Sequence, residues 1–134
     1  MIQTKLNTIK ETVNYLEIGN RPWGQYFVLE DHRHFKVKKI IVKPGHRLSL
    51  QSHEFRSEHW VVVEGEAIVE TQEPTRKTEI SKQILSVGEN CFIPEKWLHR
   101  LSNNRSVDLV IIEVQIGSST AENDIQRFED DYDR

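Results

Sequence analysis

The sequence predicts an all-β protein that folds as one sandwich or barrel, and three observations support this class. From Trp23 onward, short runs rich in Val, Ile, Phe and Tyr recur at close intervals, as strands do in such folds. Clusters of Gly, Pro, Asn and Glu separate the runs. The chain has 134 residues, about one domain, which is long enough to bury roughly two-thirds of its unfolded surface around a single core.

The expected strands follow in order, and each ends where turn residues begin. "YFVLE" and "FKVKKIIVK" lead to "KPGHR"; "LSLQSH" and "HWVVVEG" lead to Gly65; "AIVETQ" leads to the turn near Pro74. "ILSVG" ends near Gly88, "CFIPE" and "HRLSN" lead to "NNRS" at 103–106, and "LVIIEVQIG" is the last strand. We see no internal repeat and no low-complexity tract. The barrel is expected over residues 21–117.

The two ends of the chain differ from this pattern. Residues 1–20 are expected to form an arm or helix, since apolar residues fall three and four apart at Leu6, Ile9, Val13 and Leu16. Residues 118–134 are expected to form a helical tail with a cap at Ser119 or Thr120 that turns Ile125 and Phe128 inward.

Composition excludes several function classes. The net charge is -3 with scattered lysines and arginines, which argues against a nucleic-acid partner. No apolar run approaches the roughly 20 residues that cross a bilayer, so membrane residence is not expected. The N-terminal stretch has no apolar signal-peptide core, and Cys91 is the only cysteine, so no intramolecular disulfide can form. A cytoplasmic location is expected.

Metal-binding residue types concentrate in "LSLQSHEFRSEHW", residues 48–60. Alternation in a strand places Gln51 and His53 on one face, and after a tight turn Glu58 and Trp60 share a face of the next strand. A hairpin of this kind lets Gln51, His53 and Glu58 converge. His99 in "CFIPEKWLHRLSN" offers a fourth ligand from a later strand.

This mixed nitrogen and oxygen set suits Zn²⁺, Mn²⁺, Fe²⁺, Co²⁺ or Ni²⁺. Only Glu58 is charged, so a divalent ion would keep a formal charge of about +1 and could act as a Lewis acid. The alternative is that His53 and Glu58 are surface residues. The alternation places both beside Trp60 on the inward face, where an unpaired carboxylate is costly.

The other histidines fit metal binding less well. The side chain of His59 faces away from Glu58, which favours a structural or supporting role. His32 and His34 form an HxH pattern in a polar turn, and His46 follows Gly45 in another turn. Solvated loop positions are the simpler interpretation for all three.

Several stretches together resemble a known family. "RPWGQYFVLE", "FKVKKIIVKPGHRLSLQSHEFRSEHWVVVEGEA", "IPEKWLHRLSN", "IIEVQIGS" and "DIQRFEDDYDR" are similar to the type II mannose-6-phosphate isomerase domain, which usually forms the C-terminal end of bifunctional mannose-1-phosphate guanylyltransferases. The resemblance covers about residues 21–134. It implies a cupin double-stranded β-helix, or jelly-roll barrel, with one divalent metal, Zn²⁺ being the first choice.

The chain departs from the family at two points. Cupins often use an HxH pair whose second histidine would fall at Phe55, which cannot bind metal. The Gln51 and His53 spacing instead resembles the zinc site of type I phosphomannose isomerases, which places Gln51 among the ligands. The chain also has no Gly-rich nucleotide-binding stretch before Trp23, so guanylyl transfer is not expected of it.

The resemblance implies interconversion of mannose 6-phosphate and fructose 6-phosphate through a cis-enediol, in the supply of GDP-mannose for polysaccharide synthesis. Arg56 matches the arginine of the family motif "RAEHW" and is expected to stabilise enediolate charge or bind phosphate. Glu113 lies among apolar neighbours, which favours a raised pKa and a role as the base, or else a buried hydrogen-bonding role. Lys36 is a further candidate for proton transfer. The substrate-binding candidates are Lys38, Trp60 and Gln115.

Two other functions are compatible with these residues. The first is a domain that binds a sugar phosphate or sugar nucleotide without turnover, as an accessory to a separate mannose-1-phosphate guanylyltransferase. The second is another cupin enzyme, such as a different sugar-phosphate isomerase, an epimerase or an iron dioxygenase. A homodimer is expected, since exposed strand edges and an N-terminal arm favour exchange between subunits.

Overall fold

The computed structural model describes residues 14–76 and 79–134, which form eleven β-strands and no helix. No helix that could cross a bilayer therefore occurs in these ranges. The strands are β1 (Glu17–Arg21), β2 (Gly24–Asp31), β3 (Phe35–Val42), β4 (Leu50–Ser52), β5 (Arg56–Glu64), β6 (Ala67–Gln72), β7 (Ser81–Leu85), β8 (Asn90–Ile93), β9 (Leu98–Ser102), β10 (Leu109–Gly117) and β11 (Gln126–Glu129).

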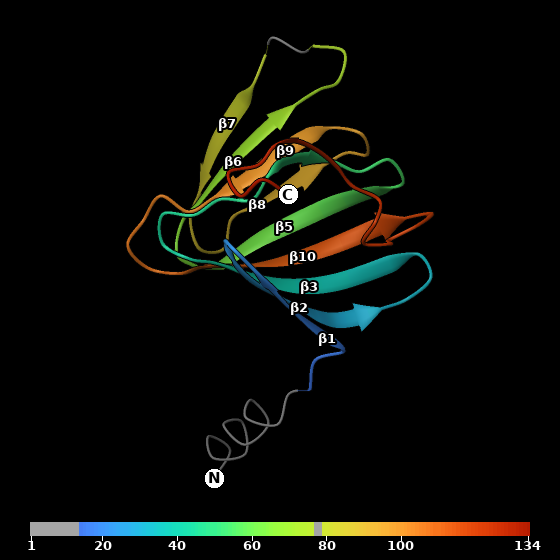
Figure 1. The fold of residues 1–134 in the computed structure, drawn as a ribbon, viewed down its shortest axis with the longest axis horizontal. Coiled ribbons are helices and arrows are strands. Elements are labelled where there is room, and N and C mark those ends of the chain that lie inside the picture. The colour runs from blue at the N-terminus through green and yellow to red at the C-terminus, as the bar shows by residue number, and fades with distance from the viewer. Residues whose placement is uncertain (1–13, 77–78) are drawn as a thin grey trace.

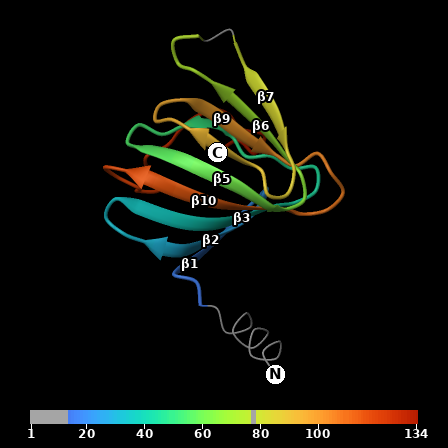
Figure 2. The same cartoon turned by 180° about the vertical axis from the view of Figure 1, so that it is seen from behind.

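The strands form two antiparallel sheets (Figure 1). One has the order β1-β2-β3-β10-β5-β8 and the other β11-β4-β9-β6-β7. Figure 2 shows the same arrangement from behind, with the β6–β7 hairpin projecting at one end. From β3 to β6 and from β7 to β11, each connection crosses from one sheet to the other. This double-stranded β-helix confirms the expected all-β barrel.

The crossing of the chain between sheets corrects one expectation about residues 48–60. β4 pairs with β9 and β11, whereas β5 pairs with β10 and β8. The two strands are therefore not a hairpin. Their polar side chains approach one another from opposite sheets, because both strands turn one face towards the barrel interior.

The barrel interior is filled by apolar residues at alternate strand positions. In β5 the buried positions are Arg56, Glu58, Trp60 and Val62, and the residues between them are more exposed. The core also contains residues of both sheets, including Val42, Ala67, Val69, Leu101, Leu109 and Ile111. Polar groups therefore share the inner faces with this core at the positions closest to the start of β5.

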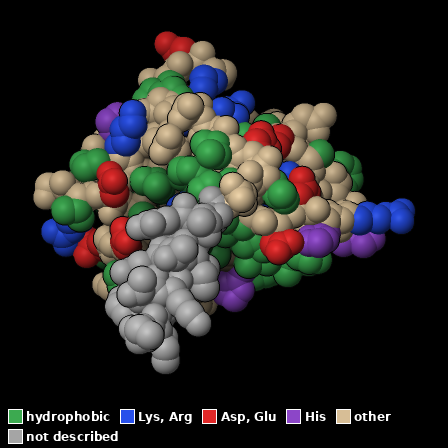
Figure 3. All heavy atoms as spheres, turned by 90° about the horizontal axis from the view of Figure 1, so that it is seen from below, with side chains coloured by type: hydrophobic (Ala, Val, Ile, Leu, Met, Phe, Trp, Pro, Cys, Tyr) green, Lys and Arg blue, Asp and Glu red, His purple; other side chains and the backbone are tan. Residues whose placement is uncertain are grey.

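The molecular surface mixes residue types. Figure 3, which shows the side seen from below, has acidic, basic and hydrophobic side chains interspersed. Large apolar side chains that remain exposed include Val61, Val63, Phe92 and Ile116 on the outward positions of β5, β8 and β10.

The expected helix over residues 118–134 is not present. Residues 126–129 instead form β11, which pairs with β4. Phe128 is 46% exposed rather than turned inward, and Ile125 is half-buried. The edge of β4 would be unpaired without β11, and satisfying its backbone groups outweighs the weak local helix signal of this acidic segment.

Most of the expected N-terminal arm, residues 1–13, lies outside the described residues. The last four residues of that arm, residues 17–20, belong to β1 and pair with β2. The six-stranded sheet thus begins slightly before the expected barrel boundary.

Candidate metal centre

Three buried side chains converge inside the barrel. His53 follows β4, Glu58 lies in β5, and His99 lies in β9. One candidate ligand atom from each residue lies within 4.8 Å of the other two. His53, Glu58 and His99 are 3%, 1% and 1% exposed, so bulk water does not stabilise the carboxylate. Of the residues proposed as ligands from the sequence, these three meet directly.

The backbone fixes how the two imidazoles are protonated. Nδ1 of His53 lies 2.7 Å from the carbonyl oxygen of Asp124, and Nδ1 of His99 lies 3.0 Å from that of Trp97. A carbonyl only accepts, so each Nδ1 must carry the proton and donate it. In the neutral rings, each Nε2 then carries the lone pair that can bind a metal.

Both Nε2 atoms point towards the Glu58 carboxylate. His53 Nε2 lies 3.1 Å from Glu58 Oε2, and His99 Nε2 lies 3.8 Å from Glu58 Oε1. Within the described part of the chain, His99 Nε2 has no hydrogen-bond partner. Two imidazole nitrogens and a carboxylate face one another here, and one of the nitrogens, His99 Nε2, is buried without a hydrogen-bond partner among the described residues. This arrangement fits a divalent cation.

The electrostatics keep His99 and Glu58 deprotonated at neutral pH. Burial lowers the pKa of His99 to about 4, and the nearby charge of Glu58 only partly opposes this. Burial would raise the pKa of Glu58, but hydrogen bonds from Glu113 and His53 and the positive charge that the imidazoles carry when protonated hold it well below its ordinary value. A carboxylate and a neutral imidazole are the forms that metals bind.

Gln51, the fourth ligand that the sequence predicts, lies on the strand next to His99. It pairs with His99 across the β4–β9 ladder, and it lines the same cavity as His53. The Ser49 hydroxyl donates a hydrogen bond of 2.8 Å to its Oε1. The amide oxygen is therefore held in a fixed orientation, with a second lone pair available.

Arg56 and Trp60 bind the carboxylate of Glu58 from two sides. Arg56 Nε donates to Glu58 Oε2 at 3.0 Å, and Trp60 Nε1 donates to Oε1 at 3.0 Å. Arg56 also reaches His53 Nε2 at 3.3 Å and the carbonyl of Ala121 at 3.3 Å. Arg56 is thus buried beside the candidate ligand atoms of His53 and Glu58.

Glu113 is a second buried carboxyl group next to this cluster. The Trp60 indole donates to its Oε1 at 3.1 Å, and Gln115 Nε2 donates to its Oε2 at 3.0 Å. Burial, followed by the charge of Glu58, raises the pKa of Glu113 to about 8. At neutral pH this carboxyl group is therefore mostly protonated, in contrast to Glu58.

Beside this cluster lies a cavity of about 130 Å³, which His53 lines but Glu58 and His99 do not. Its lining includes Lys38, Gln51, His53, Arg56, Trp60 and Glu113.

Four of the sequence-predicted residues do not line the cavity: Glu58, His99, Gln115 and Lys36. Gln115 is fully buried behind Glu113 and supports it. Lys36 binds the carbonyl of Thr120 at 2.8 Å and the Glu122 carboxylate at 3.2 Å. Lys36 therefore anchors the tail to β3. Lys38 does face the cavity, with its Nζ 2.5 Å from Glu122.

The C-terminal tail contributes contacts that sequence reasoning missed. Besides orienting His53 through its carbonyl, Asp124 accepts hydrogen bonds from the backbone N–H groups of Glu54 and Phe55 at 2.9 and 3.0 Å. Glu122 pairs with Lys36 and Lys38. No sequence signal pointed to them, because a backbone carbonyl has no residue type and the tail was expected to be helical.

The remaining histidines lie away from the cluster. His59 bonds Asn90 at 3.0 Å on the outward side of β5, and His32 contacts Glu30 at 2.8 Å in an exposed turn. His46 contacts the carbonyl of Pro44. None of them belongs to the described His–Glu–His group.

Two stacked antiparallel sheets with a buried His–Glu–His cluster between them define a cupin. Consistent with this, the oxalate decarboxylase structure from Bacillus subtilis superimposes with a TM-score of 0.72 at 17% identity, covering 87% of this chain and 31% of that one. At this identity the match concerns the fold alone. Residues 8–130 match the family described as "Mannose-6-phosphate isomerase C-terminal", and the chain belongs to that family.

Two curated relatives have similar sequences. The alginate biosynthesis protein AlgA of Pseudomonas syringae pv. tomato is 46% identical over 124 residues, which cover 92% of this chain and 24% of that protein. The mannose-1-phosphate guanylyltransferase ManC of Salmonella typhimurium is 41% identical over 116 residues, covering 85% of this chain and 22% of that protein. The chain thus spans about a quarter of the length of these relatives. It corresponds to the cupin domain of proteins of this type, which act in polysaccharide biosynthesis.

Proposed function

We propose that this chain is a metal-dependent mannose-6-phosphate isomerase that interconverts mannose 6-phosphate and fructose 6-phosphate through a cis-enediol. This activity would feed GDP-mannose and polysaccharide synthesis. The observation that carries the proposal is the buried group of His53, Glu58 and His99, which meets a cavity through His53, with Arg56 and Glu113 in the same cavity lining. The family match and the relatives support the choice of substrate.

His53, Glu58 and His99 would hold one divalent ion, with Gln51 as the fourth ligand. Zn²⁺ is the first choice, and Mn²⁺, Fe²⁺, Co²⁺ and Ni²⁺ also suit two imidazoles, a carboxylate and an amide oxygen. When bound, the ion supplies Lewis acidity to the oxygens of the substrate at C1 and C2.

Glu113 is proposed as the group that moves the proton between C2 and C1. A pKa of about 8 lets the carboxyl group exist in both forms near neutral pH, so it can accept a proton and return it. Trp60 and Gln115 hold its two oxygens in place. Because Glu113 lines the cavity, its carboxyl group is accessible to a bound sugar.

Arg56 is proposed to stabilise the negative charge of the enediolate. Its guanidinium lies at the cavity wall and its Nε is bound to Glu58, which fixes the orientation of the planar group. Lys36, a candidate for proton transfer in the sequence, receives no chemical step here because it does not line the cavity and its amine is bound to the Thr120 carbonyl and to Glu122.

A second candidate is a binding domain without turnover that assists a separate mannose-1-phosphate guanylyltransferase. It is favoured by the match to ManC, whose name gives that activity and of which this chain covers 22%. A domain of this kind would bind mannose 6-phosphate or a sugar nucleotide without converting either.

The proposal extends to a cytoplasmic homodimer. Support for the dimer comes from the exposed apolar residues Val61, Val63, Phe92 and Ile116 on the outer face of the six-stranded sheet. Sedimentation at several protein concentrations tests it, and a monomer throughout would contradict it.

Metal analysis combined with a turnover assay tests the activity. The purified protein is expected to bind about one metal per chain, to convert mannose 6-phosphate, to lose this activity on chelation and to regain it when metal is returned. Arg56→Ala and Glu113→Gln should retain metal and lose at least about 100-fold in kcat, which is typical for groups that act on the transition state. Near-normal turnover in both variants would refute these roles, and binding without turnover in the metal-loaded wild type would favour the second candidate.

A further inference from the structure

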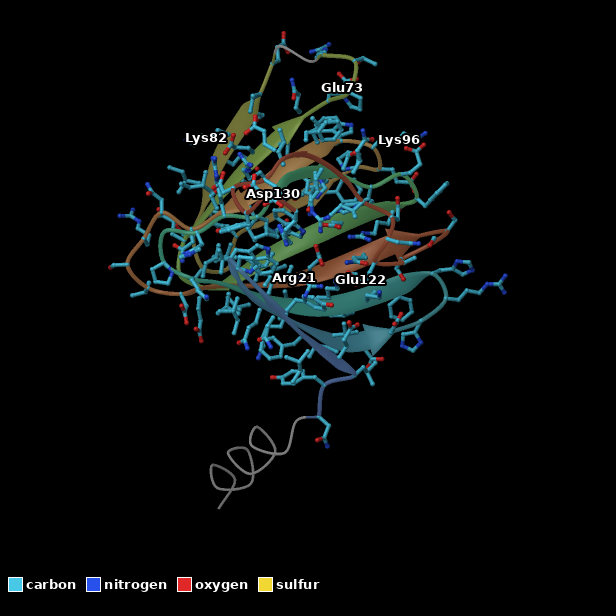
Figure 4. All side chains as sticks on the ribbon, in the orientation of Figure 1. Arg21, Glu73, Lys82, Lys96, Glu122 and Asp130 are labelled. Carbon is cyan, nitrogen blue, oxygen red and sulfur yellow. The ribbon has the colours of Figure 1, made fainter. Side chains whose placement is uncertain are left out.

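Two arginines at the mouth of the cavity carry charge that the described residues do not neutralise. Arg21 at the end of β1 and Arg127 in β11 both line the cavity, and both are exposed. They reach it from opposite sheets, since β1 belongs to the six-stranded sheet and β11 to the five-stranded one. Arg21, together with Glu122, is labelled in Figure 4, where both lie over the strands of the six-stranded sheet.

The Arg21 guanidinium is oriented by contacts with neutral groups, which leave its positive charge unpaired. It donates to the carbonyl of Asn20 at 2.9 Å and to the Tyr26 hydroxyl at 3.4 Å, and it lies 5.0 Å from the centre of the Tyr26 ring. Among residues 14–76 and 79–134, no carboxylate forms an ion pair with Arg21, and the Arg127 side chain has no hydrogen-bond or ionic partner.

The other cations that line the cavity each have an acidic partner. Lys38 pairs with Glu122 at 2.5 Å, Arg56 with Glu58 at 3.0 Å, and Arg134 with Asp130 at 2.8 Å. Two guanidiniums therefore remain unpaired at one opening, in a chain whose net charge is -3. This concentration of positive charge is local and is not a consequence of composition.

We propose that Arg21 and Arg127 form a subsite for the phosphate group of a sugar phosphate monoester, which places the sugar in the cavity beside the metal centre. A phosphate monoester carries about -1.5 to -2 charges at pH 7, which matches two free guanidiniums. Each planar guanidinium can donate two parallel hydrogen bonds to phosphate oxygens. This inference rests on the proposed function for the identity of the sugar, but the phosphate contact does not require turnover.

The subsite assigns the phosphate to residues other than those favoured by the sequence. Lys36 and Lys38 share Glu122, so binding of phosphate there would require breaking both contacts. Arg56 lies deeper, beside Glu58 and His53. The two exposed arginines offer a phosphate site without disrupting an existing ion pair.

The test measures binding of inorganic phosphate by calorimetry to the full chain kept metal-free with a chelator, so that phosphate cannot bind to a metal ion. We expect Arg21→Gln and Arg127→Gln each to weaken binding about tenfold, as loss of a charge-assisted contact predicts. Arg33→Gln is the matched control, since it removes the same charge from an exposed turn outside the cavity lining. Arg21→Lys should restore part of the affinity. Urea unfolding checks that the variants remain folded.

A second arm uses mannose 6-phosphate and mannose. The two arginine variants should weaken binding of mannose 6-phosphate and leave that of mannose unchanged. The double variant combines Arg21→Gln with Arg127→Gln. If it binds inorganic phosphate and mannose 6-phosphate as the wild type does, the proposed phosphate subsite is refuted, even where turnover is normal. If both affinities fall in the double variant and the wild type has no isomerase activity, the subsite holds and the proposed function fails.

Discussion

The carboxyl groups of Glu58 and Glu113 share one hydrogen-bond donor but have opposite protonation states at neutral pH. The indole N–H of Trp60 lies 3.0 Å from Glu58 Oε1 and 3.1 Å from Glu113 Oε1. Glu58, next to Arg56 and two histidines, keeps its charge, and that charge helps raise the pKa of Glu113 to about 8. Two carboxyl groups with separated pKa values can serve as a ligand and as an acid or base.

This relationship predicts how stability depends on pH in the metal-free protein. The folded pKa of Glu113, about 8, is above its ordinary value of 4.5, so the folded chain holds a proton that the unfolded chain releases. Stability from this group is therefore present at low pH and is lost as pH rises towards 8. We expect the unfolding free energy to fall between pH 6.5 and 8, a range that lies above the pKa of His99 in the folded protein. Glu113→Gln should reduce the slope of unfolding free energy against pH in this range. Urea unfolding in chelator at several pH values measures it, and equal slopes would contradict it.

Loss of His99 should abolish metal binding. Its Nε2 is buried and without a hydrogen-bond partner in the described chain, so metal binding is the contact that would satisfy it. For His99→Ala we expect less than about a tenth of the wild-type metal content, since only one imidazole and one carboxylate would remain beside the neutral amide oxygen of Gln51. Added Zn²⁺ should raise the melting temperature of the wild type and not of the variant. His59→Ala, exposed on the outer face, is the control and should bind metal normally.

The side chain of Asp124 should stabilise the segment between His53 and Arg56. Asp124→Ala removes two hydrogen bonds to backbone N–H groups, at 2.9 and 3.0 Å. We expect a loss of about 1–3 kcal/mol in unfolding free energy, as for charged acceptors. Metal affinity should also fall, since the Asp124 carbonyl that orients His53 would shift. Asn123→Ala, in the same exposed loop, should have little effect. Equal stability of the two variants would argue against this role.

Gly117 should tolerate no side chain. A Cβ at this position would lie 1.9 Å from the carbonyl oxygen of Phe55 and 2.7 Å from the Cα of Arg56, both backbone atoms. Gly117→Ala must therefore separate the end of β10 from the start of β5, at a cost of about 1–3 kcal/mol or more. Chemical unfolding measures this loss of stability. We also expect isomerase turnover to fall, because Arg56 at the start of β5 would be displaced. A stability unchanged from the wild type would show that the two strands separate readily here.

Much of the site followed from the alternation of strand residues. That rule placed Gln51, His53, Glu58 and Trp60 on inward faces, because successive side chains in a strand point to opposite sides. The rule predicts on which face of the sheet a side chain lies, but not whether that side chain lines the cavity. Lys36 lies on the same face of β3 as Lys38, yet only Lys38 lines the cavity, and the amine of Lys36 donates to the Thr120 carbonyl and to Glu122 in the tail.

Sequence patterns could not reveal the partners of the strands. The alternation was equally compatible with a hairpin between β4 and β5 and with the observed crossing between sheets, since both bring His53 near Glu58. The prediction of a helix in the C-terminal tail was wrong for a related reason. Its helix signal was local, whereas β11 forms because β4 offers an unpaired edge that is distant in sequence.

The hydrogen bond from His53 to the Asp124 carbonyl joins residues 71 positions apart. During synthesis, His53 and Glu58 emerge long before the group that sets the tautomer and direction of the first imidazole. A growing chain therefore contains most of the coordinating atoms before it can present them correctly. The proposed uptake of an ion would therefore be a late event, reached only after the segment that contains Asp124 has packed against His53.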